Sequence, residues 1–145
     1  MNIDKATMKA IAEQFGVPVA EIEAMAQLGE DGLRVLDDVY AAREFTPEGF
    51  FAFFRVLNGY DVLPYWKDAI RRLFKQHEAG PVEAIIEAFR GSAKTTTFTI
   101  HFIAWFIGQK PHLSNLFVQA SDESAAMNAK NVANIIANEP KYRLI

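Results

Sequence analysis

The stretch "FRGSAKTTTF", residues 89–98, decides how the rest of this sequence is interpreted. It places Lys94 and a run of threonines directly after a loop of small residues. Such a loop can wrap backbone N–H groups around a phosphate at the start of a helix. Against the full pattern G-x-x-x-x-G-K-[ST], however, Ala88 and Ala93 occupy the two glycine positions, and Gly91 is an additional glycine. On these residues alone, a nucleotide site and a plain strand-to-helix turn both stay open.

The residues on either side of the loop predict a strand before it and a helix after it. "VEAIIEAF" (82–89) is a short apolar run between Gly-Pro and Arg-Gly, which suits a buried strand. Residues 95–107 carry Phe98, Phe102 and Trp105 at helical spacing, and Gly and Pro residues follow. We therefore expect the strand–loop–helix context that a phosphate loop requires.

A second strand and a second helix complete the predicted unit. "LSNLFVQA" (113–120) is the second strand candidate, and Ser121 then has the character of an N-cap followed by two acidic residues. The order strand, loop, helix, strand, helix predicts an α/β fold with a parallel sheet. We interpret residues 81–145 as the first βαβα part of a P-loop NTPase domain, incomplete in this chain.

Residues 1–80 predict a helical N-terminal region. Residues 6–27 have the outline of a helix-turn-helix, but their second helix carries Glu21 and Glu23 where a DNA reader needs cations or amides. A packing or protein-docking role is the better interpretation. Thr46 and the proline after it predict the start of an aromatic-rich helix over residues 46–60, and a helix with a basic face follows over residues 64–76.

Length and composition indicate a soluble protein with one domain. The chain has 145 residues, half of them hydrophobic, and no cysteine, so disulfides and thiolate metal sites are excluded. Neither a signal peptide nor an apolar run long enough to cross a bilayer is present, which predicts an intracellular location. Residues 1–48 hold four basic and ten acidic side chains, whereas residues 49–145 hold eleven basic and eight acidic ones. This asymmetry indicates that the two parts face different partners, or that one of them faces none.

The departures from the full glycine pattern are themselves specific. "FRGSAKTT", with an arginine four residues before the lysine and a small residue just before it, resembles the variant Walker A loop of phage terminase large subunits, the ATPase motors that package DNA. The resemblance covers about residues 60–145, and its loop is the most specific part. It implies ATP and Mg²⁺ as cofactors, double-stranded DNA, the terminase small subunit and the portal protein as partners, and a homo-oligomeric ring in the host cytoplasm.

The resemblance also implies a role for each loop residue. Lys94 would contact the β- and γ-phosphates, Thr95 would ligate Mg²⁺, and Thr96 would support the α-phosphate end. Arg90 would stabilise the γ-phosphate, which agrees with the charge that develops on a leaving phosphoryl group. The loop amides would come from Gly91, Ser92 and Ala93.

Upstream, Tyr65 or Trp66 would be the ring that stacks on adenine, although aromatic side chains at a helix start also pack structurally. Hydrolysis further needs a pair of acidic residues on a later strand, and no such pair precedes Ile145. We therefore expect a fragment or a remnant of a motor, one that binds ATP but hydrolyses little by itself. Two alternatives remain: another P-loop ATPase of the helicase type, and a non-catalytic helical module that docks a protein.

Overall fold

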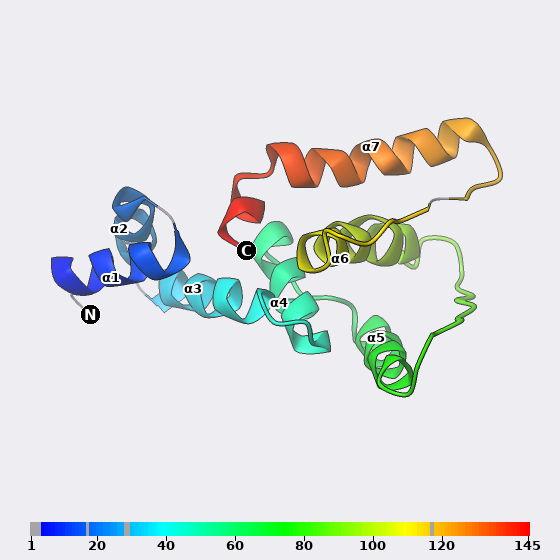
Figure 1. Ribbon diagram of the computed structural model, residues 1–145, viewed down its shortest axis with the longest axis horizontal. Helices are drawn as coiled ribbons and strands as arrows, with labels where there is room; N and C mark the ends of the chain where they lie inside the picture. The colour runs from blue at the N-terminus through cyan, green and yellow to red at the C-terminus, as the bar shows by residue number, and fades with distance from the viewer. Residues whose placement is uncertain (1–3, 17, 28–29, 117) are drawn as a thin grey trace.

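Every regular element that the structure describes is helical. The computed structural model describes residues 4–16, 18–27, 30–116 and 118–145. The elements, in chain order, are α1 (Lys5–Phe15), α2 (Val19–Gln27), α3 (Glu30–Ala42), α4 (Pro47–Asn58), α5 (Pro64–His77), the π-helix η1 (Thr95–Phe102), α6 (Ile103–Gln109), α7 (Asp122–Asn138) and the 3₁₀-helix η2 (Pro140–Leu144). Figure 1 shows α1 and α2 at one end, joined through α3 to a larger group formed by the remaining helices.

The helix boundaries follow from local capping, as the sequence predicts. The Thr46 side chain accepts a hydrogen bond from the N–H of Gly49 (3.0 Å), and α4 ends where Gly59 turns left-handed and donates to the carbonyl of Arg55 (2.8 Å). Ser121 caps α7 in the same way through the N–H of Ser124 (3.3 Å). The predicted helices over residues 46–60 and after Ser121 are therefore confirmed.

The main core is built around α4. Its phenylalanines Phe50, Phe51, Phe53 and Phe54 are all buried. Trp105 of α6 packs on this cluster, with its ring centroid 5.7 Å from that of Phe50, and its indole N–H donates to the carbonyl of Ala42 (2.8 Å). Burial of these large rings supplies most of the hydrophobic stabilisation in this part of the chain.

The N-terminal helices form a smaller cluster of their own. Ala12, Ile22 and Leu36, one from each of α1, α2 and α3, are buried together. The connection to the main core runs through α3 and α4, where the guanidinium of Arg55 pairs with the carboxylate of Asp38. This pair holds the pKa of Arg55 above its ordinary value, since the hydrogen bond to Asp38 favours the charged form.

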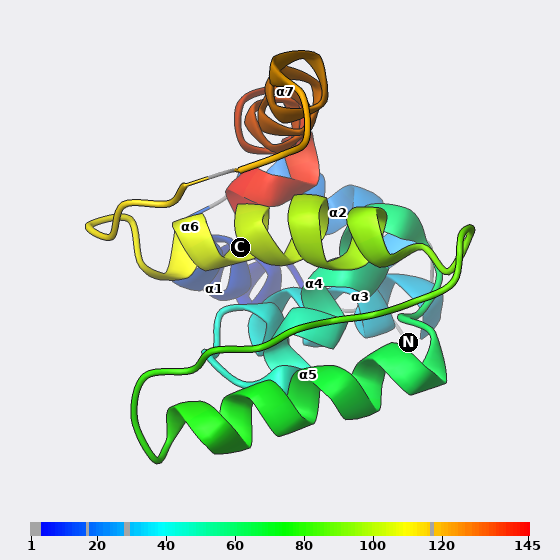
Figure 2. The same ribbon diagram turned by 90° about the vertical axis from the view of Figure 1, so that its right-hand side faces the viewer.

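The expected α/β fold with a parallel sheet is wrong for the chain that the structure describes. Residues 82–89 and 113–120 are extended or irregular, and no strand occurs in the described ranges; Phe117 of the second segment lies outside them. Figure 2 shows the first segment running between α5 and α6, and the second on the opposite side of α6. Because that helix separates the two segments, their backbones cannot exchange the hydrogen bonds of a ladder.

Candidate functional site

The loop that follows residues 82–89 has a backbone conformation that side chains rarely adopt. Gly91 has a φ of 86° and Ala93 a φ of 60°, whereas Lys94 is already helical at φ −55° and ψ −50°. A left-handed alanine costs about 1–2 kcal/mol relative to an ordinary conformation. Alternation of left-handed and right-handed residues is the geometry in which successive N–H groups form an anion-binding concavity. Gly91 and Ala93 therefore lie together in a loop at the start of a helix.

Two side chains of α5 bind the backbone of this loop. The hydroxyl of Tyr65 (3.0 Å) and the indole N–H of Trp66 (2.7 Å) both donate to the carbonyl oxygen of Ser92. The Trp66 ring also meets Phe98, one turn into η1, edge to face at a centroid distance of 5.1 Å. Ser92 and Trp66 are only 3% and 5% exposed, whereas Tyr65 is 45% exposed. The start of α5, the loop and the first turn of η1 therefore form one packed unit.

The charged and hydroxyl side chains of the loop differ in how far they are exposed to solvent. The ammonium group of Lys94 is half-buried and donates to the carbonyl of Ile86 (3.3 Å). Arg90 and Thr95 are exposed, and Thr96 is half-buried. An ammonium carries three N–H donors, so the bond to Ile86 leaves two of them for a ligand.

His101 contributes a buried polar contact that the sequence does not reveal. Its Nδ1–H donates to the carbonyl of Thr96 (2.7 Å), and its ring lies 4.8 Å from that of Phe54. Burial lowers the pKa of His101 below its usual value of 6.5. The contact joins His101 to a carbonyl five residues back along the chain, which fits the wide turn of a π-helix rather than that of an α-helix.

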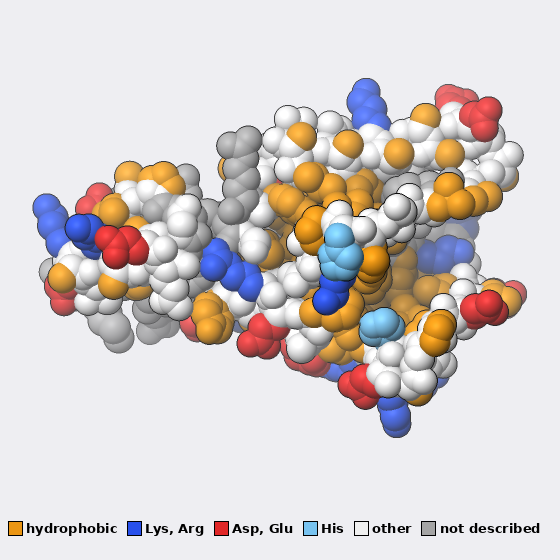
Figure 3. Space-filling model, in the orientation of Figure 1, with side chains coloured by type: hydrophobic (Ala, Val, Ile, Leu, Met, Phe, Trp, Pro, Cys, Tyr) orange, Lys and Arg blue, Asp and Glu red, His pale blue; other side chains and the backbone are white. Residues whose placement is uncertain are grey.

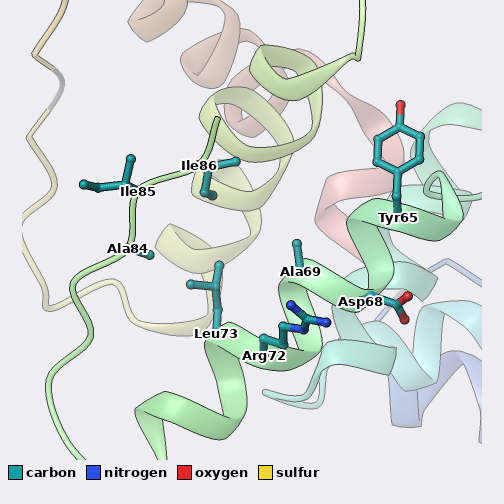
Figure 4. A pocket seen from close by; sticks show the side chains of 8 residues that line it. All are labelled: Tyr65, Asp68, Ala69, Arg72, Leu73, Ala84, Ile85 and Ile86. Atoms are coloured by element: carbon teal, nitrogen blue, oxygen red, sulfur yellow. The ribbon is translucent and has the colours of Figure 1, made fainter. Parts of the chain in front are cut away.

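A hollow of about 360 Å³ lies between α5 and residues 84–86. Tyr65, one of the two residues expected to stack on adenine, is among the residues that line it. Figure 4 shows the side chains that line it: Tyr65, Asp68, Ala69, Arg72 and Leu73 on α5, across from Ala84, Ile85 and Ile86. The exposed Tyr65 can offer a ring face to a base here, and the buried Trp66 offers little. Adenine stacking by either ring stays a prediction.

A second, apolar hollow lies along the other end of α5. It has a volume of about 450 Å³ and is lined largely by aromatic rings, among them Phe45, Phe74, Phe102 and Phe106. Figure 3 shows hydrophobic side chains gathered in this recess between α5 and α6. The ammonium of Lys110 lies 4.9 Å from the centroid of the Phe45 ring, a cation–π contact at the edge of the recess.

The fit of ATP-Mg²⁺ to this site rests on the loop itself. Within the described ranges, no group of three His, Cys, Asp or Glu side chains is arranged to hold a metal ion. Mg²⁺ needs few protein ligands when phosphate oxygens and water complete its shell, and the hydroxyl of Thr95 is suited to be one of them. The N–H of Ser92 donates to the carbonyl of Phe89 (3.2 Å), so it is not available to a ligand. The remaining loop N–H groups, the ammonium of Lys94 and the hydroxyl of Thr95 are the groups that would meet a magnesium–phosphate ligand.

Two further findings bear on the class of protein. None of the helices in the described part of the chain has both the length and the apolar character needed to cross a lipid bilayer. In comparisons with protein-family models, with curated proteins and with solved structures, nothing matched this chain.

Proposed function

We propose that residues 90–95 bind the phosphates of ATP together with Mg²⁺. In this proposal the chain is the ATP-binding part of a terminase-type DNA-packaging motor. The observation that carries the proposal is the left-handed conformation of Gly91 and Ala93 immediately before Lys94 and Thr95. Strain of this kind persists where the surrounding structure enforces it, and it concentrates at ligand sites. The sequence resemblance of the same loop is the second support.

Each residue then has a defined task. The loop N–H groups other than that of Ser92, which donates to the carbonyl of Phe89, would bind phosphate oxygens together with the first turn of η1. The Lys94 ammonium would neutralise the charge of the phosphates. Thr95 supplies a hydroxyl to Mg²⁺, and Arg90 lies on the exposed side, within the same loop, where it can meet the terminal phosphate. When bound, ATP-Mg²⁺ supplies phosphoryl-transfer chemistry. Double-stranded DNA, the small subunit, the portal protein and further copies of the chain are the partners that this proposal implies.

A thermal-unfolding experiment tests phosphate binding directly. At about tenfold excess of ATP-Mg²⁺ over its dissociation constant, mass action stabilises the native state by about 1.4 kcal/mol, which raises Tm by about 3–6 °C for a chain of this size. Lys94→Ala should abolish this shift. Lys75→Ala is the matched control, because Lys75 is an exposed lysine near the end of α5. The absence of a shift in the unchanged protein, or an equal shift in Lys94→Ala, would contradict the proposal.

A helical protein-docking module is the second candidate function. It is favoured by the helical nature of all described elements and by the separate cluster that Ala12, Ile22 and Leu36 form in the acidic N-terminal part. This candidate predicts a cooperatively folded chain whose Tm does not respond to ATP-Mg²⁺. The same melting curves therefore separate the two functions.

A further inference from the structure

We infer that Tyr65 and Trp66 are positioning residues of the loop: by hydrogen-bonding the Ser92 carbonyl together, they orient the Ala93 N–H for phosphate. This inference rests on the proposed function and assigns the two aromatic residues a role other than adenine stacking. It concerns how the loop is held, so it can fail while phosphate binding by the loop stands.

The first step is the saturation of one carbonyl oxygen. A backbone carbonyl has two lone pairs, and Tyr65 and Trp66 each donate to that of Ser92. The donors come from a helix start 26 and 27 residues earlier in the chain. Two donors from a packed helix fix the direction of this C=O bond much more firmly than water would, because α5 is anchored in the core through Trp66 and Ile70.

The second step follows from the planarity of the peptide bond. The structure contains no cis peptide bond among its described residues, so the carbonyl of Ser92 and the N–H of Ala93 point in opposite directions. Since the carbonyl points inward to the buried Trp66 indole, the Ala93 N–H points away from the protein interior. Ala93 itself is exposed, so this donor faces the side where a phosphate would bind.

The third step explains how the loop works without a glycine before the lysine. Glycine adopts positive φ without steric cost, whereas Ala93 at φ 60° is strained. Released from its partners, this alanine would relax to an ordinary conformation and turn its N–H away. The pair of hydrogen bonds from α5 therefore does for Ala93 what the absence of a Cβ does for glycine.

Binding of inorganic tripolyphosphate with Mg²⁺, measured beside ATP-Mg²⁺, tests the inference. Tyr65→Phe removes only the hydroxyl, and loss of one such hydrogen bond should weaken both ligands by the same factor, about threefold to tenfold. Tyr60→Phe is the matched control, since Tyr60 is an exposed tyrosine whose ring contacts Phe54. This control should leave both affinities unchanged. Trp66→Phe provides a second variant with the larger loss, and its Tm shows whether it folds.

A double-mutant cycle separates positioning of the loop from general packing. In an Ala93→Gly background, positive φ no longer carries strain, so Tyr65→Phe should weaken tripolyphosphate binding less than it does beside alanine. A merely structural hydroxyl would give equal losses in both backgrounds and would overturn the inference.

The remaining outcomes are also decisive. If Tyr65→Phe weakens ATP but not tripolyphosphate, Tyr65 contacts the base and the inference is wrong. If the unchanged protein binds tripolyphosphate and Tyr65→Phe matches Tyr60→Phe, the inference fails while the proposed function stands. If the unchanged protein binds neither ligand, the proposed function fails and the inference fails with it.

Discussion

Helix α4 and the 82–89 segment are both short and apolar, yet they differ in how deeply their large apolar side chains are buried. The four phenylalanines of α4 are almost completely buried, whereas Ile85 and Phe89 are 93% and 71% exposed. A helix satisfies its own backbone hydrogen bonds and can bury any side that meets a neighbour. An extended segment needs a partner strand for the same purpose, and here it lies against helices instead. Apolar composition alone therefore did not decide burial.

The largest expected effect contrasts one side chain from each region. Phe50→Ala should lower the free energy of unfolding by about 3–5 kcal/mol, because it removes a ring from the centre of the main core. Ile85→Ala should change it by less than about 0.5 kcal/mol, since the side chain is already in solvent. Urea denaturation measures both. A loss above about 1.5 kcal/mol for Ile85→Ala would show that the segment is buried in solution.

The next effect concerns the close approach of α4 to the turn before it. A Cβ on Gly49 would overlap the carbonyl oxygen of Glu44, and the carbonyl of Ala41 is also close, at 3.0 Å. Gly49→Ala should therefore cost about 3 kcal/mol through overpacking against rigid backbone. Gly59→Ala is the control, where only the positive φ of 73° is strained and about 1 kcal/mol is expected. Equal losses in the two variants would mean that the turn can move aside.

The buried His101, at the border between the core and the loop, gives a pH-dependent effect. Its pKa is lowered in the folded state, so the unfolded chain binds its proton first as the pH falls. At a pH above 6.5, the ordinary pKa of histidine, this group should not affect the free energy of unfolding. As the pH drops below 6.5 the free energy of unfolding should fall, and it should level off once the pH is below the folded-state pKa of His101. His101→Phe should reduce the slope between about pH 7.5 and pH 5. His112→Gln, at an exposed histidine, should retain it.

The smallest expected effect lies in the loop and has the opposite sign. Ala93→Gly should raise the free energy of unfolding by up to about 1 kcal/mol, because relief of the left-handed strain exceeds the added freedom of the unfolded chain. Gly91→Ala, at φ 86°, should lower it by about the same amount. Thermal melting of the two variants, without any ligand, measures both changes in the free energy of unfolding. A destabilised Ala93→Gly would show that residue 93 is unstrained in solution.

The helices could be predicted because their signals are local. A cap such as Thr46 or Ser121 acts on an N–H three residues away, and aromatic residues at helical spacing mark the buried side. The two predicted strands failed for the complementary reason. Short apolar runs fit a buried strand or any other buried segment, and only a neighbouring strand can make them part of a sheet. The sequence contains the runs but no information on whether they meet.

The sequence by itself determined the helical elements, their caps and the chemical groups of the loop: a cation, hydroxyls and small residues in a row before a helix. The tertiary structure decided that residues 82–89 and the second extended segment stay on opposite sides of α6, and that Tyr65 and Trp66 bind the Ser92 carbonyl. The physical reason is the distance along the chain over which each kind of interaction acts. Capping and helical hydrogen bonds act within a few residues, whereas the contacts that orient the loop join residues 26 and 27 positions apart and form only when the core brings α5 beside it.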